Sequence, residues 1–248
     1  MNNDINKILE AESNGISGGN LSKKPFISYL ITTKNEGNQI KELYNLLSDY
    51  ITGNEIVFID DYSTDSHTLT FYSDLKWAEI PGKLVQFHQH HLDGDYGGHK
   101  NFGIEQCRGE WIFQIDADEL PVDNLLAELP GILKTNFTTE LFWISRINKF
   151  VGVTEENAKQ WGWNIDNPGK WINWNTGDYQ TRIFKNLPYI RWNGRLHERI
   201  MGNKTYAFLP KDEDYALIHT KTIAKQIQTN LRYNKEFTKE DNLGLSSK

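Results

Sequence analysis

The chain has 248 residues, of which 38% are hydrophobic and 12% aromatic, and its formal net charge is −6 at pH 7. This composition excludes a largely disordered chain and fits one large α/β domain with a sizeable core. The negative charge argues against a protein whose whole surface grips nucleic acid or anionic lipid, but it allows a local basic groove. The single cysteine, Cys107, excludes an internal disulfide and suits a reducing compartment.

The two ends of the chain differ in composition from its middle. Residues 1–24 are polar and rich in Asn, Ser and Gly, which predicts a flexible leader, and residues 239–248 predict a frayed tail. No run approaches the roughly 18 consecutive apolar residues of a membrane span, and the start lacks the basic and apolar regions of a signal peptide. We therefore expect one soluble domain over residues 25–238, located in the cytoplasm, with peripheral attachment to a membrane as the alternative.

Five apolar segments have the composition of buried strands. They begin near Phe26, Glu55, Leu84, Trp111 and Leu141. The starts are about 27–30 residues apart, which is the length of one βα unit. This rhythm predicts an α/β fold with a mostly parallel central sheet and helices on both faces.

Three segments carry apolar residues at helical spacing. The first is Glu36–Ile51, with Asn35 as its expected N-cap. The second is Val122–Leu133, which Pro130 is expected to end or bend. The third, Thr222–Phe237, has isoleucine and leucine side chains four residues apart, which predicts an amphipathic helix near the end of the domain.

Residues 161–192 have a different texture, with many aromatic rings among Asn, Gly and Asp and no clear periodicity. They include five of the eight tryptophans: Trp161, Trp163, Trp171, Trp174 and Trp192. Large flat rings beside amides suit a surface that stacks sugars or bases. Packing within an irregular second half would also account for these rings, and the sequence leaves both interpretations open.

Polar and acidic residues follow three of the predicted strands. The first strand runs into Thr32–Glu36, the second into Asp60–Asp65, and the fourth into Asp116, Asp118 and Glu119. Because ligands of parallel α/β sheets bind at the carboxyl ends of the strands, we expect these groups to converge on a polar ligand and a hard cation. Taken alone, the D-x-D pair also fits a solvated turn that caps the next helix.

The usual phosphate-binding motifs are missing from the sequence. It contains neither G-x-G-x-x-G nor G-x-x-x-x-G-K-[ST], which argues against Rossmann dinucleotide binding and P-loop chemistry. A phosphorylated ligand would then need its charge neutralised by a bound cation and by a side chain such as Lys100.

In this order, the motifs ITTKNE, FIDDYSTD, GGHKNFGIEQCRGEWIFQIDADE, RLHE and IHT resemble the family 2 nucleotide-sugar glycosyltransferases of the GT-A fold. The resemblance covers roughly Phe26–Phe237. It implies a Rossmann-like donor half, about residues 25–120, and an irregular, aromatic-rich acceptor half, about residues 121–238. It also implies inverting transfer of a sugar from a nucleoside-diphosphate sugar, with a UDP-sugar expected, to a hydroxyl acceptor.

The resemblance assigns roles to individual residues. The nucleotide base and ribose would be held by Thr32, Asn35, Glu36, Asp60 and Asp61. Lys100 would contact the donor near its phosphates. Asp116 and Asp118 match the D-x-D of the family, with Asp118 as the more direct ligand of Mn²⁺ or Mg²⁺. His219 would complete the metal site.

The catalytic base is expected in the acceptor half. Many relatives carry an acidic pair there, whereas this chain has His197 and Glu198, as in a subset of the family. Inverting transfer needs a base to take the acceptor's hydroxyl proton, so Glu198 is the first candidate and His197 the second. A surface ion-pair motif with Arg195 and Arg199 is the alternative.

The sequence leaves the acceptor open among a glycan, a lipid-linked molecule, a phosphate-bearing polymer and a modified DNA base. From Arg182 to Lys204 there are six basic residues against one acidic residue, with Tyr189 and Trp192 between them. This pattern fits an acceptor groove for a phosphate-bearing polymer. Basic residues that balance a carboxylate-rich site would give the same pattern.

Three other functions remain as alternatives. A zinc site could use His88, His90, His91 and His99, although no cysteine pair accompanies them and His91 would point to the opposite strand face from its neighbours. A metal-dependent nucleotide-sugar hydrolase would also place aspartates at strand ends. A non-catalytic glycan-binding module would account for the aromatic half, but it would not need two aspartates and a histidine together.

Overall fold

The computed structural model describes residues 24–77, 84–166, 171–238 and 241. The first half contains four parallel strands in the order β3-β2-β1-β4. They are β1 (Ile27–Thr33), β2 (Glu55–Asp60), β3 (Leu84–Gln89) and β4 (Trp111–Asp116). The helices between them are α2 (Asn38–Ser48), α3 (Ser66–Trp77) and α4 (Tyr96–Gln106). The strand rhythm of the sequence is therefore confirmed.

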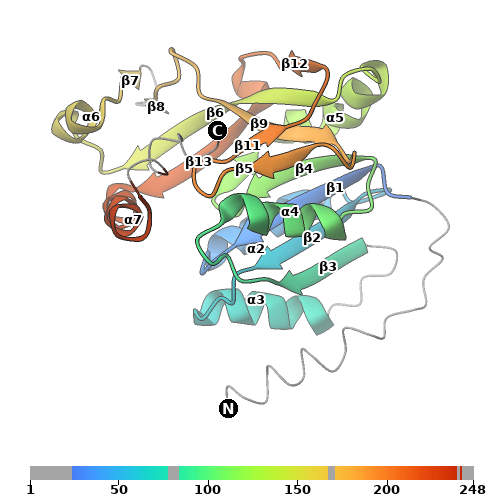
Figure 1. The fold of residues 1–248 in the computed structure, drawn as a ribbon, viewed down its shortest axis with the longest axis horizontal. Helices are drawn as coiled ribbons and strands as arrows, with labels where there is room; N and C mark the ends of the chain where they lie inside the picture. Colours follow the sequence, from blue (N-terminus) through green and yellow to red (C-terminus); the bar gives the residue numbers. More distant parts are fainter. Residues whose placement is uncertain (1–23, 78–83, 167–170, 239–240, 242–248) are drawn as a thin grey trace.

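The same sheet continues through the second half of the chain (Figure 1), in the order β4-β9-β6-β13-β5. These strands are β5 (Glu119–Pro121), β6 (Leu141–Val151), β9 (Tyr179–Lys185) and β13 (Ala216–Thr222). β9 runs antiparallel to both β4 and β6, whereas β13 is parallel to β6. Consequently β4, β6 and β13 all end at the same edge of the sheet.

Shorter elements complete the second half. The helices are α5 (Asp123–Thr135), α6 (Glu155–Trp161), the 3₁₀ turn η1 (Glu213–Tyr215) and α7 (Ile223–Glu236). The short strands are β7 (Ile165–Asp166), β8 (Trp171–Ile172) and β12 (Tyr206–Phe208), and β10 (Arg191–Asn193) pairs with β11 (Arg199–Met201) as a separate hairpin. No helix in the described residues is long and apolar enough to cross a membrane.

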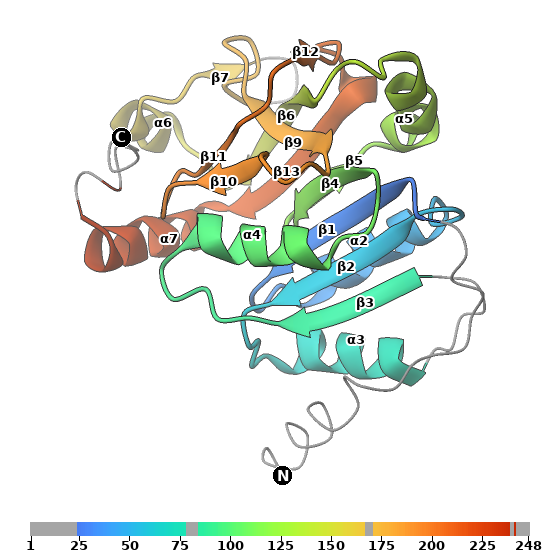
Figure 2. The ribbon, with the colours of Figure 1, turned by 45° about the vertical axis from the view of Figure 1, so that its right-hand side comes forward.

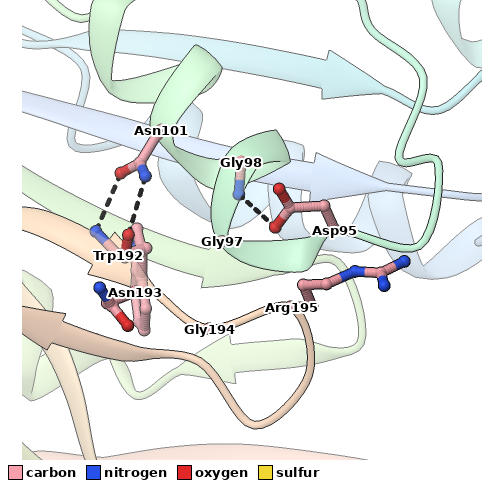
Figure 3. A pocket seen from close by; sticks show the side chains of 8 residues that line it. All are labelled: Asp95, Gly97, Gly98, Asn101, Trp192, Asn193, Gly194 and Arg195. Carbon is pink, nitrogen blue, oxygen red and sulfur yellow. Dashed lines mark hydrogen bonds between the residues drawn. The ribbon is translucent and has the colours of Figure 1, made fainter. Parts of the chain in front are cut away.

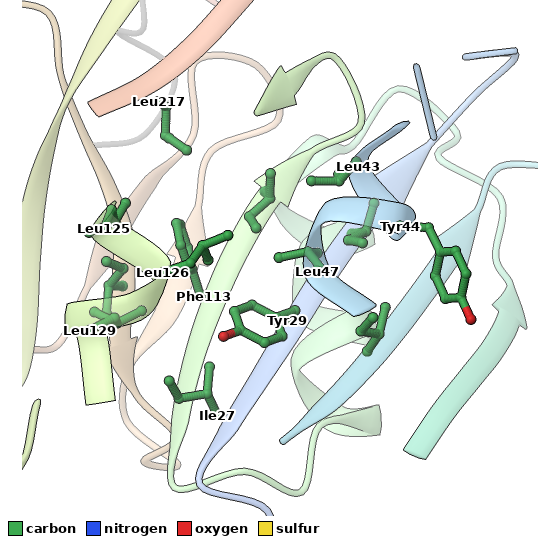
Figure 4. Packing of buried hydrophobic residues seen from close by; sticks show 14 of the residues in the cluster. Ile27, Tyr29, Leu43, Tyr44, Leu47, Phe113, Leu125, Leu126, Leu129 and Leu217 are labelled. Carbon is green, nitrogen blue, oxygen red and sulfur yellow. The ribbon is translucent and has the colours of Figure 1, made fainter. Parts of the chain in front are cut away.

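Apolar side chains fill both faces of the sheet. On one face, Leu47 of α2 and Leu129 of α5 pack against Tyr29 and Phe113 (Figure 4). On the other, Ile104 of α4 and Trp192 of the β10–β11 hairpin belong to a second cluster. Figure 2 shows α4 and the hairpin together on this face, with α2 behind the sheet. The predicted α/β class, with a mostly parallel sheet and helices on both faces, is confirmed.

One local prediction about a helix end is wrong, and one alternative of a second is excluded. Asn35 does not cap α2, which begins at Asn38 after Gly37. The Asn35 side chain instead accepts hydrogen bonds from the backbone amides of Thr64 and Asp65, which ties two loops together. Pro130 lies inside α5 and does not end it. Leucines buried before and after the proline hold the helix against the sheet. The predicted leader and tail lie outside the described residues, except for Lys24 and Asp241.

The β10–β11 hairpin is held against α4 by hydrogen bonds with Asn101 and by a close approach of the two backbones at Gly97. The Asn101 amide donates to the Trp192 carbonyl and accepts from the Trp192 N–H, at 2.8 and 2.9 Å. A Cβ atom on Gly97 would lie only 2.5 Å from the carbonyl oxygen of Gly194. This contact with backbone cannot be relieved by a side-chain rotation. The chain therefore needs glycine at this position for the hairpin to approach the helix.

We expect Gly97→Ala to lower the free energy of unfolding by about 1–3 kcal/mol, the usual cost of overpacking. Gly131→Ala is the matched control, because no atom lies within 4 Å of the added methyl group. The control should stabilise α5 by up to about 1 kcal/mol through helix propensity. Urea denaturation of the two variants measures the difference, and equal shifts would contradict the close approach of hairpin and helix.

Candidate active site

The carboxyl edge of the sheet gathers the polar residues that follow β1, β2 and β4. Thr32 and Asp116 are partners in the β1–β4 register, and the Thr32 hydroxyl donates to Asp116 at 3.2 Å. Thr33 donates to the Asp60 carboxylate at 3.1 Å. The expected convergence of three strand ends is therefore confirmed by the geometry.

The loops after β1 and β2 are joined by hydrogen bonds. Asp60 is fully buried and accepts from the Ser63 hydroxyl and N–H and from Thr33, so both its oxygens are engaged. The Ser63 hydroxyl in turn accepts from the Asn35 N–H at 2.8 Å. Asp60 thus organises these loops, and the carboxylate that keeps some exposure is that of Asp61.

Asp61 and Glu36 lie nearer the surface of the same edge. Lys34 contacts Asp61 at 3.4 Å, and the Leu92 N–H donates to Asp61 at 3.1 Å. Glu36 pairs with Lys225 of α7 at 2.8 Å. Burial raises the pKa of Glu36, and the negative charge of Asp118 raises it further. Helix α7 thus reaches the predicted donor loop through an ion pair.

Asp116 is surrounded by positive charge. Arg182 donates to it at 2.5 Å and Lys100 lies 3.2 Å away, while the Gln114 amide donates at 2.8 Å. Burial would raise the pKa of Asp116, but Arg182 and Lys100 outweigh this and hold it well below its ordinary value. Asp116 is therefore a permanent anion whose oxygens are engaged by the protein.

A buried glutamate and a second arginine extend this array. Glu119 is fully buried and accepts from Arg182 at 2.7 Å and from Arg146 at 3.0 Å. It also accepts from the Asp116 N–H at 3.2 Å. Glu119 was expected at this edge as a group near the ligand, but its role as the partner of two arginines was not predicted. Nothing in the local sequence marks Arg146.

Asp118 faces His219, which lies in the middle of β13. The His219 Nε2 lies 3.5 Å from Asp118 Oδ2, and the His219 Nδ1 lies 2.9 Å from the side-chain oxygen of Asn148. Burial would raise the pKa of Asp118, but a hydrogen bond and positive charge from His219, which require the protonated ring, lower it overall. In the part of the chain that the structure describes, Asp118 contacts no arginine, unlike Asp116. The structure brings together Asp118 and His219 as the sequence predicts.

The two candidate bases have different surroundings. Glu198 turns inward and its carboxylate accepts from Lys100 at 2.7 Å, so that Lys100 bridges Glu198 and Asp116. The Lys100 ammonium also lies 4.6 Å from the centroid of the Trp192 ring. His197 is exposed and has a backbone φ of 54°. This geometry favours Glu198 over His197 as the group that faces the site.

A cavity of about 320 Å³ lies between the first turn of α4 and the hairpin (Figure 3). Its lining residues are Asp95, Gly97, Gly98, Asn101, Trp192, Asn193, Gly194 and Arg195. It adjoins the turn that carries Glu198 and is lined mainly by backbone, amide and charged groups. Such a lining suits a hydroxyl-rich molecule.

The predicted aromatic surface is divided in the structure. Trp163 contacts Phe150, whose ring meets His219 edge-on at 5.8 Å, so these rings flank the Asp118 site. Trp171 and Trp174 contact each other at 5.4 Å. Trp192 instead packs in the core beneath Lys100.

The basic stretch from Arg182 to Lys204 does not line a single groove. Arg182 is buried within the site, whereas Lys185 pairs in register with Trp111 at the opposite edge of the sheet. Lys204 lies beside Tyr189 at 4.9 Å from its ring. These three basic residues therefore do not share one groove, because Arg182 is buried and Lys185 lies near the other end of β9.

The histidine cluster does not form a zinc site. His88 contacts Gln86, His91 stacks on Tyr62, and His90 pairs with His99 at 3.3 Å. Among the residues that the structure describes, no group of three or more His, Cys, Asp or Glu is arranged to hold a metal ion. Among the described residues, Asp118 and His219 face each other as a pair and not as part of a larger group of this kind.

Residues 28–206 match the sequence profile of glycosyl transferase family 2. The chain belongs to this family. It is 32% identical over 105 residues to the SPbeta prophage-derived glycosyltransferase SunS of Bacillus subtilis, a match that covers 42% of this chain and 23% of that protein. It is 33% identical over 111 residues to the lipopolysaccharide core biosynthesis glycosyltransferase LpsC of Rhizobium meliloti, covering 43% of this chain and 38% of LpsC. The chain thus spans less than half of these relatives.

Solved structures confirm the GT-A fold. S. aureus TarS matches with a TM-score of 0.53 at 18% identity, over 79% of this chain and 36% of TarS. TarS 1-349 in complex with UDP matches with a TM-score of 0.51 at 20% identity, over 79% of this chain and 60% of that chain. At such identities the likeness concerns the fold.

We expect Arg182→Met to lower the free energy of unfolding by about 3–5 kcal/mol, because it leaves Glu119 and Asp116 as buried charges with too little compensation. Arg199→Met is the control, since Arg199 is exposed. The control should change stability by less than about 0.5 kcal/mol. Chemical denaturation at neutral pH measures both, and a small effect of Arg182→Met would contradict the central role of this arginine.

Proposed function

We propose that this protein is an inverting glycosyltransferase that moves a sugar from a nucleoside-diphosphate sugar to a hydroxyl group, with a divalent cation on the diphosphate. The proposal rests on two pairs of side chains that lie on either side of Asp116. Asp118 and His219 lie on one side, and Lys100 with Glu198 lies on the other.

The residues present fit a cation of the Mg²⁺ or Mn²⁺ type. Asp118 and His219 offer one oxygen and one ring nitrogen that face each other at 3.5 Å. Mg²⁺ is usually held by one or two carboxylates together with substrate phosphates, and a full cage of protein ligands is not required. A cation here would neutralise the diphosphate as it leaves. Asp116 stays bound to Arg182 and Lys100, so we assign it to positioning the loop and the donor rather than to direct ligation.

The donor would occupy the edge formed by the loops after β1 and β2. Thr32, Asn35, Glu36, Asp60 and Asp61 surround this edge, and Lys100 stands at its inner end. Lys100 can exchange its contact with Asp116 for a phosphate oxygen. UDP is the nucleotide in the TarS 1-349 complex, which supports a UDP-sugar as the first donor to test.

Glu198 would act as the general base. Glu198 lies in the turn of the hairpin, the same turn whose Gly194 and Arg195 line the cavity next to α4. A hydroxyl acceptor in this cavity would give its proton to Glu198 while its oxygen attacks the anomeric carbon from the face opposite the diphosphate. The polar lining of the cavity supports a glycan as the acceptor.

The metal site is tested by Asp118→Asn. The variant should lose Mn²⁺-dependent binding of UDP, because a neutral amide is a poor ligand for a hard cation. His219→Ala should weaken this binding less severely. Asp74→Asn, at an exposed position of α3, is the control and should bind like the parent. Calorimetric titration with UDP, with and without Mn²⁺, measures the loss. Parental binding by the Asp118 variant would reject the proposed cation site.

The base is tested by Glu198→Gln, which keeps size and hydrogen bonding but removes basicity. Transfer should slow by roughly 10²- to 10⁴-fold, the range of general-base catalysis, while donor affinity hardly changes. His197→Gln should retain most of the turnover, since His197 is exposed. A hydrolase would instead release sugar from the donor without dependence on an acceptor. If Glu198→Gln keeps more than about a tenth of parental turnover, Glu198 is not the base.

A further inference from the structure

The charged array around Asp116 continues across the sheet to His219. Arg146, which contacts Glu119, also donates to Asp178 from two nitrogens, each at 2.9 Å. The same Asp178 oxygen accepts from the Asn148 amide at 2.6 Å. Asn148 then contacts His219 at 2.9 Å, and His219 faces Asp118. An unbroken series of contacts therefore joins the first aspartate of the D-x-D to the second.

Each contact in this series fixes the direction of the next hydrogen bond. An ionised carboxylate only accepts, so the Asn148 atom that faces Asp178 is the NH₂ group. The other end of the amide, which faces His219 Nδ1, is then the oxygen. Because that oxygen only accepts, Nδ1 carries the hydrogen and donates it. The lone pair of neutral His219 is thereby left on Nε2, the atom that faces Asp118.

We infer that Asp178 and Asn148 are positioning residues that select the tautomer of His219 able to bind the cation. The inference rests on the proposed cation site. Ring nitrogens that bind metals commonly have their second N–H held by an acceptor, which sets both tautomer and ring orientation. Here the acceptor is the Asn148 amide, and Asp178 with Arg146 determines which way that amide points.

Three side chains donate hydrogen bonds to Asp178 and keep it ionised. It accepts from Arg146, Asn148 and Gln180, the last at 2.6 Å. Burial would raise its pKa, but these donors lower it overall. Its Oδ2 receives both Arg146 and Asn148, and its Oδ1 receives Gln180. Asp178 is therefore held by the residues that orient His219.

The decisive variants exchange groups at the buried Asn148. Asn148→Leu keeps the volume and apolar packing but removes the acceptor of the His219 N–H. The double variant Asn148→Asp with Asp178→Asn, called the swapped pair, exchanges the amide and the carboxylate. It keeps the net charge and an acceptor for His219, and the amide at position 178 now donates to the carboxylate at position 148. If Asn148 served only packing, Asn148→Leu would preserve the His219 tautomer and the Mn²⁺ affinity better than the swapped pair does. If Asn148 positions His219, the swapped pair would preserve them better.

The first measurement uses ¹⁵N-histidine-labelled protein without metal, at a pH where imidazole is neutral. The His219 signals are identified by their absence in His219→Gln. We expect the parent to show a protonated Nδ1 and an unprotonated Nε2, Asn148→Leu to show a mixture, and the swapped pair to restore the parental pattern. A parent protonated on Nε2, or an unchanged pattern in Asn148→Leu, overturns the inference.

The second measurement is the affinity for Mn²⁺ in the presence of UDP, by calorimetry. Asn148→Leu should weaken it by roughly 10- to 100-fold, the range for outer-shell partners of metal ligands, and the swapped pair should recover most of this. Equal or better affinity of the leucine variant than of the swapped pair overturns the inference. Absence of Mn²⁺ binding by the parent would reject the cation site and with it the assigned purpose, although the tautomer result would stand alone as a test of the hydrogen-bond series.

Discussion

The pairing of Arg182 with Asp116 and Glu119 is the interaction on which the rest of the site depends. A buried arginine that serves two carboxylates joins the end of β4 to the start of β5 and holds the D-x-D turn from below. Its position follows from the topology, because β9 is inserted antiparallel between β4 and β6. Strand β9, which joins the two halves of the sheet, thus also carries Arg182, whose positive charge compensates Asp116 and Glu119. Buried charges without this pairing would be strongly unfavourable.

The two aspartates of the D-x-D differ because their neighbours differ. Asp116 is surrounded by Arg182, Lys100, Gln114 and Thr32, whereas Asp118 meets His219. The first is therefore already neutralised by the protein, and the second still has coordination to offer. This division lets a short motif combine a structural anion with the proposed ligand for a cation. It also explains why replacing either residue should have different consequences.

Lys100 connects the proposed donor side to the proposed acceptor side. It contacts Asp116 and Glu198 together, over the ring of Trp192. The hairpin that carries Glu198 reaches this lysine only because Gly97 allows its backbone to approach α4. The proposed base, the proposed phosphate contact and the nearby cavity are therefore parts of one packed unit. A change in the packing of α4 would therefore displace Lys100 from both Asp116 and Glu198.

The sequence by itself determined the arrangement of the first four strands. The apolar runs, their spacing and the polar residues at their ends were enough to predict four parallel strands and the convergence of Thr32, Asp60 and Asp116, because these features follow from local periodicity. The meeting of Asp118 with His219 was expected only through family resemblance. Tertiary structure alone decided the roles of Arg146, Glu119 and Asp178, and it separated Arg182 from the basic residues near it in sequence. These contacts join residues on different strands, and their formation depends on strand order and direction, which no local pattern encodes.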